Sequence, residues 1–289
     1  PVLVYGVGVA GAATINFLLR QNIDVIAADD RLNETKQLEL SKLGIEVVTA
    51  PSPDALRDLV ASSEYVAPAP GIPETHPVIL EALTQKKSVK TELDIAYEWE
   101  SQRIGGARPM LAVTGTDGKT TTVMMAEAIL QAAGHSSIAC GNTEVPLVEA
   151  LDMAVDSFVV EASSFRLAFI ESFRAEASAW LNFDADHLDW HKSMKSYEQA
   201  KARLWRNVVA DDTAIGVSGE NAVMRHLQNV ACRRRVVGGS GDYRTINGIL
   251  SGPQGVIIAE SDLSRSLPHD VLNALAAGAP HIDLCLVLL

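Results

Sequence analysis

Two glycine-rich segments, each set between an apolar run and a stretch of helical composition, constrain the fold of this chain more than any other feature. The first, residues 6–11, precedes the helical stretch 12–20. The apolar runs around it are residues 2–5, 24–28, 45–48 and 65–67. Alternating apolar runs and helical stretches are typical of strand–helix–strand units. They predict a parallel, doubly wound sheet that extends to about residue 92.

A break in this periodicity divides the chain. Residues 102–109 contain two glycines and a proline, and the alternation restarts at Met110. The strands predicted after this point are residues 110–113, 157–161, 177–182 and 214–217. A length of 289 residues suits two domains better than one. We therefore predict an α/β protein with a Rossmann-like N-terminal domain (1–92), a linker (93–109) and a P-loop-type central α/β domain (110–289).

The composition excludes several classes of protein. With 36 acidic and 24 basic residues the net charge is −12, which disfavours a general nucleic-acid binder because phosphate backbones attract clustered positive charge. Cys140, Cys232 and Cys285 are far apart, so no disulfide framework or zinc site is expected and a reducing, cytoplasmic compartment is favoured. The apolar run 284–289 is shorter than the roughly 20 residues of a membrane span, so no membrane association is expected.

The first glycine-rich segment fits a nucleotide-binding fingerprint. It reads Gly-Val-Gly-Val-Ala-Gly, and Asp29 and Asp30 follow at the end of the next predicted strand. Glycines in such a loop let the backbone approach a diphosphate at a helix N-terminus, while the later acid meets a ribose. NAD or FAD, another nucleotide, and plain tight packing all remain open for this motif alone.

The second glycine-rich segment, residues 114–121, reads Thr-Gly-Thr-Asp-Gly-Lys-Thr-Thr between a strand and a helix. The standard phosphate-loop pattern has glycine where Val113 stands, but its Gly-Lys-Thr end is kept. Such a loop exposes N–H groups, with Lys119 placed for the terminal phosphates and Thr120 for Mg²⁺. The alternative is a glycine-rich surface turn with a solvated lysine.

Polar residues follow two later strands, at the edge where open α/β sheets bind ligands. Glu161 ends the strand 157–161, and residues 182–191 contain several acids and two histidines after the strand 177–182. These groups are candidates for a metal site, although such a loop can also be ordinary polar surface. Of the two histidines, His187 is the better ligand candidate, and we expect His191 not to bind the metal.

Two basic features carry no function on composition alone. Apolar residues at helical spacing predict an amphipathic helix over 195–209, and Lys201 flanks its buried stripe. A lysine in that place is normally exposed at its charged end. The arginines at 233–235 resemble a solvated patch in a connecting segment.

Several motifs, taken in order, resemble the Mur ligase family. They are Thr-Gly-Thr-Asp-Gly-Lys-Thr-Thr at 114–121, Gly-Asn at 141–142, Glu-Ala-Ser-Ser-Phe at 161–165, Asp-His-Leu-Asp at 186–189, Tyr197 with Lys201, and His-Asp-Val-Leu-Asn at 269–273. With the first glycine loop and Ala-Pro-Gly at 69–71, the resemblance extends from residue 1 to about 277. Local departures from the family pattern are Asp117, Arg166, Thr143 with Glu144, and Asp270.

The resemblance implies roles for particular residues. The first domain would hold the uridine diphosphate of a substrate rather than NAD, at Val9, Ala10, Asp30, Arg31 and Gly71, with Asn142 and Ser163 as further substrate contacts. ATP would bind at Gly115, Thr116, Asp117, Gly118, Lys119, Thr120, Thr121 and Asn273. Two Mg²⁺ ions would be held by Thr120, Glu161, His187 and Lys201. Lys201 would be carbamylated, and Lys119, Lys201 and His187 would be the catalytic side chains.

The activity implied is that of an ATP-dependent amide ligase of peptidoglycan precursor synthesis. Glu-x-Ser-Ser-Phe followed by Asp-His-Leu-Asp-Trp-His is most similar to family members that add D-glutamate to UDP-N-acetylmuramoyl-L-alanine through an acyl phosphate. A ligase with another amino acid or acceptor, and a non-catalytic nucleotide-binding protein, are the alternatives. Family members also have a third domain, and with about a dozen residues after Ala277 we expect it to be absent here and ligation to be weak.

Overall fold

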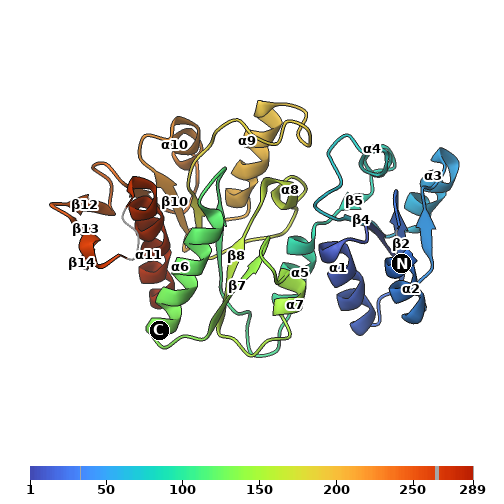
Figure 1. Cartoon of the computed structure of the whole chain (residues 1–289), viewed down its shortest axis with the longest axis horizontal. Helices are drawn as coiled ribbons and strands as arrows, with labels where there is room; N and C mark the ends of the chain where they lie inside the picture. Colours follow the sequence, from blue (N-terminus) through green and yellow to red (C-terminus); the bar gives the residue numbers. More distant parts are fainter. Residues whose placement is uncertain (33, 264–266, 289) are drawn as a thin grey trace.

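A computed structural model describes residues 1–32, 34–263 and 267–288, with side chains up to residue 279 in the final helix. Two sheets lie side by side (Figure 1). The first has the strand order β3-β2-β1-β4-β5 and all its pairings are parallel. Its strands are β1 (Val2–Tyr5), β2 (Val25–Asp29), β3 (Val47–Thr49), β4 (Tyr65–Pro68) and β5 (Ser88–Val89). Its helices are α1 (Val9–Arg20), α2 (Glu34–Lys42), α3 (Pro53–Ser62) and α4 (Pro77–Thr84).

The second sheet is also parallel, with the order β11-β10-β9-β6-β8-β7. Its strands are β6 (Met110–Thr114), β7 (Ser137–Gly141), β8 (Ser157–Glu161), β9 (Ala177–Trp180), β10 (Thr213–Val217) and β11 (Arg233–Val237). Its helices are α6 (Lys119–Ala132), α7 (Leu147–Ala150), α8 (Ser164–Leu167), α9 (Met194–Ala202), α10 (Asn221–Leu227) and α11 (Pro268–Leu288). The α/β class predicted from the sequence is confirmed.

Both glycine-rich loops lie where the strand order reverses. The chain adds β2 on one side of β1 and β4 on the other, and it likewise adds β8 and β9 on the two sides of β6. Open parallel sheets bind ligands at such switch points, beyond the carboxyl ends of the strands. The strands β6 and β8 are buried at every residue, as expected for strands that helices cover on both faces.

A small antiparallel sheet extends from the second unit beside α11 (Figure 1). It consists of β12 (Arg244–Ile246), β13 (Ile249–Gly252) and β14 (Gly255–Ala259). Of the two 3₁₀ turns in the second unit, Arg203–Trp205 follows α9 and Glu260–Asp262 follows β14. The helix α11 packs along α6. This packing brings α11 to the loop that precedes α6.

The helix α5 (Glu92–Glu100) begins at the last residue of the predicted first domain and occupies the first half of the predicted linker 93–109, and residues 101–109 then connect to β6. Thr91 and Asp94 form a capping box at the start of α5. The buried Asp94 carboxylate also accepts hydrogen bonds from the backbone N–H groups of Glu171, Ser172 and Phe173. The helix α5 is therefore attached to the second unit by three backbone hydrogen bonds to the buried Asp94 carboxylate.

Two expectations about local structure are wrong. The arginines at 233–235 lie in β11, at the edge of the second sheet, and not in a connecting segment. The strand was missed because its first three residues are charged and do not form an apolar run. An edge strand accommodates such side chains. The helix expected over 195–209 ends at Ala202 and continues as the turn Arg203–Trp205.

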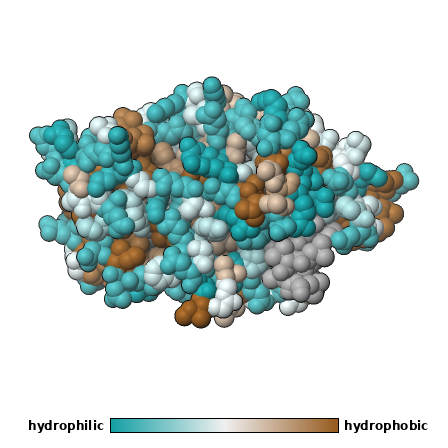
Figure 2. All heavy atoms as spheres, turned by 180° about the vertical axis from the view of Figure 1, so that it is seen from behind, coloured by the Kyte–Doolittle hydropathy of each residue, from teal (hydrophilic) through white to brown (hydrophobic). Residues whose placement is uncertain are grey.

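The surface seen from behind is mostly hydrophilic, with small separate apolar patches (Figure 2). Within the described ranges, each helix is too short or too polar to cross a membrane. Leu289 and the side chains of the apolar run 284–289, including Cys285, are outside the described residues.

Candidate functional site

The loop between β6 and α6 is held by a side chain from a different strand end. Asn182 was predicted as the last residue of the strand 177–182, but β9 ends at Trp180 and Asn182 lies two residues after it. Its Oδ1 accepts hydrogen bonds from the backbone N–H groups of Thr116, at 2.8 Å, and Asp117, at 2.9 Å. Its Nδ2 donates to the carbonyl of Asp117 at 3.2 Å. Asn182 therefore fixes the loop conformation, a role that the sequence did not indicate.

Gly118, at the N-cap of α6, requires glycine. Its φ of +80° lies in the left-handed region, and a Cβ there would be 2.7 Å from Oδ1 of Asn273. Asn273 comes from α11 and is buried against the loop. The first N–H groups of a helix lack carbonyl partners within the helix, so the start of α6 presents donors to an anion.

Lys119 folds back over this loop. Its Nζ donates to the carbonyls of Gly115, at 3.0 Å, and Thr116, at 2.8 Å. Burial lowers the pKa of Lys119, while the charges of Glu161 and two aspartates oppose this shift. The lysine is partly buried, so the alternative of a fully solvated loop lysine is wrong.

Lys201 approaches the same carbonyl from α9. Its Nζ donates to the carbonyl of Gly115 at 2.6 Å and lies 4.7 Å from the centre of the Tyr197 ring. Only 1% of the residue is exposed, so the exposed position expected from composition is wrong. Burial, and then the charge of Lys119, lower the pKa of Lys201 to about 7. The spacing of apolar residues predicted which face of α9 is buried. It did not predict that the loop at Gly115 covers the side of the helix where Lys201 lies.

Glu161 faces the first turn of α6 from the neighbouring strand β8. Its carboxylate is buried and accepts hydrogen bonds from Oγ1 of Thr120, at 2.8 Å, and Nδ2 of Asn142, at 3.0 Å. Ser163 caps the following helix α8 by accepting a hydrogen bond from the N–H of Arg166. Hydroxyl and carboxylate oxygens are the ligands that Mg²⁺ prefers.

These groups line one cavity of about 350 Å³. The predicted residues that line it are Thr116, Asp117, Gly118, Lys119, Thr120, Thr121, Asn142, Glu161, Ser163, His187 and Lys201. His187 is partly exposed there, and its ring centroid lies 4.7 Å from that of Phe165. Gly115 binds both lysines through its carbonyl, and Asn273 lies behind Gly118, outside the lining.

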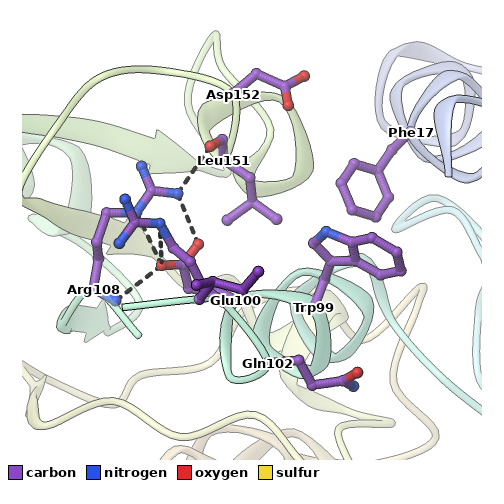
Figure 3. A pocket seen from close by; sticks show the side chains of 9 residues that line it. Phe17, Trp99, Glu100, Gln102, Arg108, Leu151 and Asp152 are labelled. Carbon is purple, nitrogen blue, oxygen red and sulfur yellow. Dashed lines mark hydrogen bonds and ion pairs between the residues drawn. The ribbon is translucent and has the colours of Figure 1, made fainter. Parts of the chain in front are cut away.

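A larger cavity of about 440 Å³ lies elsewhere, between α1, α5 and α7, and contains none of the predicted residues. Arg108 donates from both its backbone and its guanidinium to the carboxylate of Glu100, and Trp99 lies beside Phe17 (Figure 3). The charges at its floor thus neutralise each other. The smaller cavity, where two lysines and the start of α6 face the same space, is the better candidate for an anionic ligand.

The first glycine-rich loop also has a fixed geometry. A Cβ at Gly11 would lie 1.8 Å from the carbonyl oxygen of Gly6, so the loop closes only with glycine there. The carboxylate of Asp29 accepts hydrogen bonds from the N–H groups of Val7, at 2.7 Å, and Arg31, at 2.8 Å. Asp29 is thereby used to hold the loop.

The residues predicted to contact a UDP-linked substrate lie at neighbouring strand ends. Val9 and Ala10 open α1 after β1, Asp30 and Arg31 follow β2, and Gly71 follows β4. The strand β1 pairs with both β2 and β4, so these residues share one edge of the sheet. Val9, Arg31 and Gly71 are exposed.

The loop after β9 connects the two sheets. Trp190 donates from Nε1 to the carbonyl of Pro70 at 2.9 Å. The buried His191 contacts Glu74 through Nδ1, at 2.7 Å, and the Ser164 hydroxyl through Nε2, at 3.0 Å. His191 does not line the cavity, and it joins the loop after β4 to the start of α8.

Arg166, one of the departures from the family pattern, is buried and paired with Glu92. Glu92 also accepts a hydrogen bond from the N–H of Val148 at 3.0 Å. The charge of Arg166 is therefore paired with that of Glu92 where α5, α7 and α8 meet.

Two family models match the chain. The family model described as "Mur ligase middle domain" matches residues 113–279, and that described as "Mur ligase MurD-like, N-terminal domain" matches residues 1–91. The chain belongs to the Mur ligase family, as its motifs predicted.

The curated relatives that the chain resembles share one enzyme name. A UDP-N-acetylmuramoylalanine–D-glutamate ligase of Frankia casuarinae is 36% identical over 296 residues, which cover 96% of this chain and 60% of that protein. The enzyme of the same name from Mycolicibacterium vanbaalenii is 35% identical, with 96% of this chain and 58% of that protein covered. The chain thus spans about three fifths of the length of these relatives.

Solved structures share the fold at lower identity. A UDP-N-acetylmuramate:L-alanyl-gamma-D-glutamyl-meso-diaminopimelate ligase from Neisseria meningitides has a TM-score of 0.60 at 18% identity, covering 98% of this chain and 93% of that one. A UDP-N-acetylmuramate–alanine ligase from Thermotoga maritima has a TM-score of 0.56 at 21% identity, covering 98% and 65%.

The role of Asn182 predicts a change in local protection. In Asn182→Ala the amide hydrogen of Asp117 loses its acceptor, and that of Thr116 keeps only the longer hydrogen bond to the backbone carbonyl of Asn182, at 3.3 Å. The amide of Asp117 should therefore exchange with solvent at least ~10-fold faster, as the loss of a roughly 1.4 kcal/mol interaction would give, and that of Thr116 should exchange faster by a smaller factor. Hydrogen exchange followed by mass spectrometry or NMR measures this. Asn229→Ala, at an exposed helix end, is the control. Unchanged exchange at residues 116 and 117 would show that another group holds the loop.

Proposed function

We propose that this chain carries the nucleotide-binding parts of an ATP-dependent ligase that adds D-glutamate to UDP-N-acetylmuramoyl-L-alanine in peptidoglycan precursor synthesis. The observation that carries the proposal is the meeting of Lys119 and Lys201 at the carbonyl of Gly115, beside Thr120 and Glu161. In this proposal residues 1–92 bind the UDP-linked substrate, residues 93–109 form the connection and residues from 110 bind ATP. The names of the relatives supply the amino acid and the acceptor.

The phosphate chain of ATP would bind at the start of α6. The first N–H groups of the helix and the ammonium of Lys119 would face its oxygens, as in other phosphate loops. Both lysines donate to the same carbonyl, so each can turn from it toward an incoming phosphate without losing a buried ion pair.

The side-chain oxygen atoms of Thr120 and Glu161 are suitable ligands for a Mg²⁺ ion that also binds phosphate. Within the described ranges no three His, Cys, Asp or Glu side chains come together as a metal cluster. A site with one carboxylate and one hydroxyl suits Mg²⁺, which takes its other ligands from phosphates and water. When bound, the ion offsets charge on the transferred phosphoryl group. A second ion would lie toward His187 and Lys201.

Lys201 would supply an oxygen ligand for that second ion after carbamylation. With a pKa of about 7, a large share of its amine is neutral at physiological pH. For an ordinary lysine of pKa about 10.4 that share is on the order of 0.1%. The neutral nitrogen attacks the carbon of CO₂ and releases a proton, which leaves a carbamate anion. The modification replaces a cation that repels Mg²⁺ with an anion that binds it.

The proposed reaction needs no nucleophile from the protein. The carboxylate of the L-alanyl group attacks the γ-phosphorus of ATP, forming an acyl phosphate and releasing ADP. The amine of D-glutamate then attacks the acyl carbon, phosphate leaves, and the nitrogen loses a proton to give the amide. Lys119 would stabilise the charge that develops on the phosphoryl oxygens.

Binding measurements test the proposal. Calorimetry should show that the chain binds UDP-N-acetylmuramoyl-L-alanine and a non-hydrolysable ATP analogue, and product formed with ATP should require D-glutamate. Product with meso-diaminopimelate or L-alanine instead would assign the chain to another branch of the family. Failure to bind either nucleotide would overturn the proposal.

Lys119 gives a first prediction. Lys119→Ala should lower affinity for the ATP analogue at least ~10-fold because it removes a cation from the phosphate site, while thermal unfolding changes little. Lys42→Ala, at the exposed end of α2, is the matched control. Wild-type ATP affinity in a folded Lys119→Ala variant would remove Lys119 from the phosphate site.

Lys201 gives a second prediction, with a defined pH dependence. Its amine becomes neutral as the pH rises through about 7, so the carbamate should increase over that range and be lost in acid. Carbon-13 NMR in labelled bicarbonate should detect it in wild type and in the exposed-lysine control Lys192→Ala. Lys201→Arg keeps a cation but cannot form a carbamate, so the signal should vanish. A signal that persists in Lys201→Arg would place the modification elsewhere.

A further inference from the structure

Three elements of the first sheet converge on the carboxylate of Asp30. Tyr5, the last residue of β1, donates from its hydroxyl to Oδ1 of Asp30 at 2.6 Å. His76, which precedes α4, lies with Nε2 at 2.9 Å from Oδ2. Asp30 itself follows β2 directly. Among the described residues each carboxylate oxygen therefore has one hydrogen-bond partner, and the two partners come from different elements.

The proton on His76 can be placed from its second contact. Nδ1 of His76 accepts the backbone N–H of Val78 at 3.2 Å and so caps α4. A ring nitrogen that accepts carries no hydrogen, so in the neutral ring the hydrogen is on Nε2. His76 consequently donates to Asp30, just as Tyr5 does.

The two partners of the Asp30 carboxylate are more buried than the carboxylate itself. Tyr5 is buried, and its ring lies 4.9 Å from that of His76. The side chain of His76 is 13% exposed and that of Asp30 is 51% exposed. The two rings thus hold the carboxylate from the protein side, and its outer edge stays open to solvent.

The charge state of Asp30 agrees with this arrangement. Partial burial opposes ionisation, but the hydrogen bonds from Tyr5 and His76 outweigh it and hold the pKa of Asp30 below its usual value. An ionised carboxylate accepts two hydrogen bonds at each oxygen. With the partners that the described residues supply, one acceptor position on each oxygen is left for a ligand.

The neighbouring Asp29 shows the contrast. Its two oxygens accept the backbone N–H groups of Val7 and Arg31, so it holds the glycine loop. The sequence offered both aspartates as candidates for the acid that meets a nucleoside. The structure distinguishes them, because the Asp30 carboxylate is held by the side chains of the buried Tyr5 and the largely buried His76 and has an edge open to solvent.

We propose that His76 and Tyr5 are positioning residues that orient the Asp30 carboxylate to accept a hydrogen bond from the nucleoside of the UDP-linked substrate. This inference rests on the proposed function. The ligand group must be a donor, which in uridine diphosphate is a ribose hydroxyl or the imide N–H of the base. A carboxylate fixed at both oxygens binds such a donor without first losing rotamer freedom.

Calorimetry with UDP and the intact chain tests this proposal. His76→Asn retains a side-chain oxygen that can cap α4 but is too short to reach Asp30. It should weaken UDP binding about 5-fold, and Tyr5→Phe should have a similar effect, because each removes one of two hydrogen bonds that orient the carboxylate. Affinity for an ATP analogue should not change in either variant.

A double-mutant cycle separates positioning from a merely structural role. In an Asp30→Ala background, His76→Asn should cost less than 2-fold in further UDP affinity. An equal loss with and without Asp30, or unchanged UDP affinity in His76→Asn, would overturn the proposal. If wild type binds UDP but the His76 variant shows no loss, only this inference fails. If wild type does not bind UDP, the proposed function fails.

UDP analogues identify the donor. Analogues without the 2′-hydroxyl, without the 3′-hydroxyl or with a methyl group on N3 each remove one candidate. With the analogue that lacks the true donor, His76→Asn should cause no further loss. A loss that is unchanged with all three analogues would contradict acceptance of a nucleoside hydrogen bond by Asp30.

Discussion

The candidate site depends on two lysines that donate to one backbone carbonyl, that of Gly115. Within the described residues neither Lys119 nor Lys201 has an ion-pair partner, and each is at least partly buried. Two such cations repel each other, and the charge of Lys119 contributes to the low pKa of Lys201. Buried, unneutralised charge is unfavourable unless a ligand or a modification offsets it. This cost is the physical reason to expect phosphate oxygens, and a carbamate at Lys201, in this cavity.

The rest of the structure holds that arrangement in place. Asn182 binds the phosphate loop at the start of the segment after β9, and Trp190 and His191 near its end bind the loop after β4. A single segment thus contacts the loops at which we propose that the two nucleotides bind, and His187 lies in it between these contacts. At the other side of the junction, Asp94 fastens α5 to residues 171–173 through backbone hydrogen bonds. The two sites are therefore built on elements whose relative positions are set by buried polar contacts.

The sequence predicted best those features that depend on local pattern. The strands β1 and β8 were located at their observed ends because every residue in them is buried, so each is a continuous, mostly apolar run. It did not reveal β11, where arginines occupy an edge strand, or the burial of Lys201, which depends on a loop 86 residues away. The roles of Asn182 and His76 were hidden for the same reason, since their partners lie 65 and 46 residues distant. The family motifs indicated Lys201 where periodicity could not.

The most direct test of this account is the titration of the Lys201 side chain, followed by NMR of selectively labelled lysine in CO₂-free buffer. Lys201→Arg assigns the resonance. The account predicts a midpoint near pH 7, and a shift to higher pH when an ATP analogue brings negative charge beside the amine. A midpoint near that of an ordinary lysine, unchanged by the nucleotide, would contradict the claim that two buried lysines form the phosphate site.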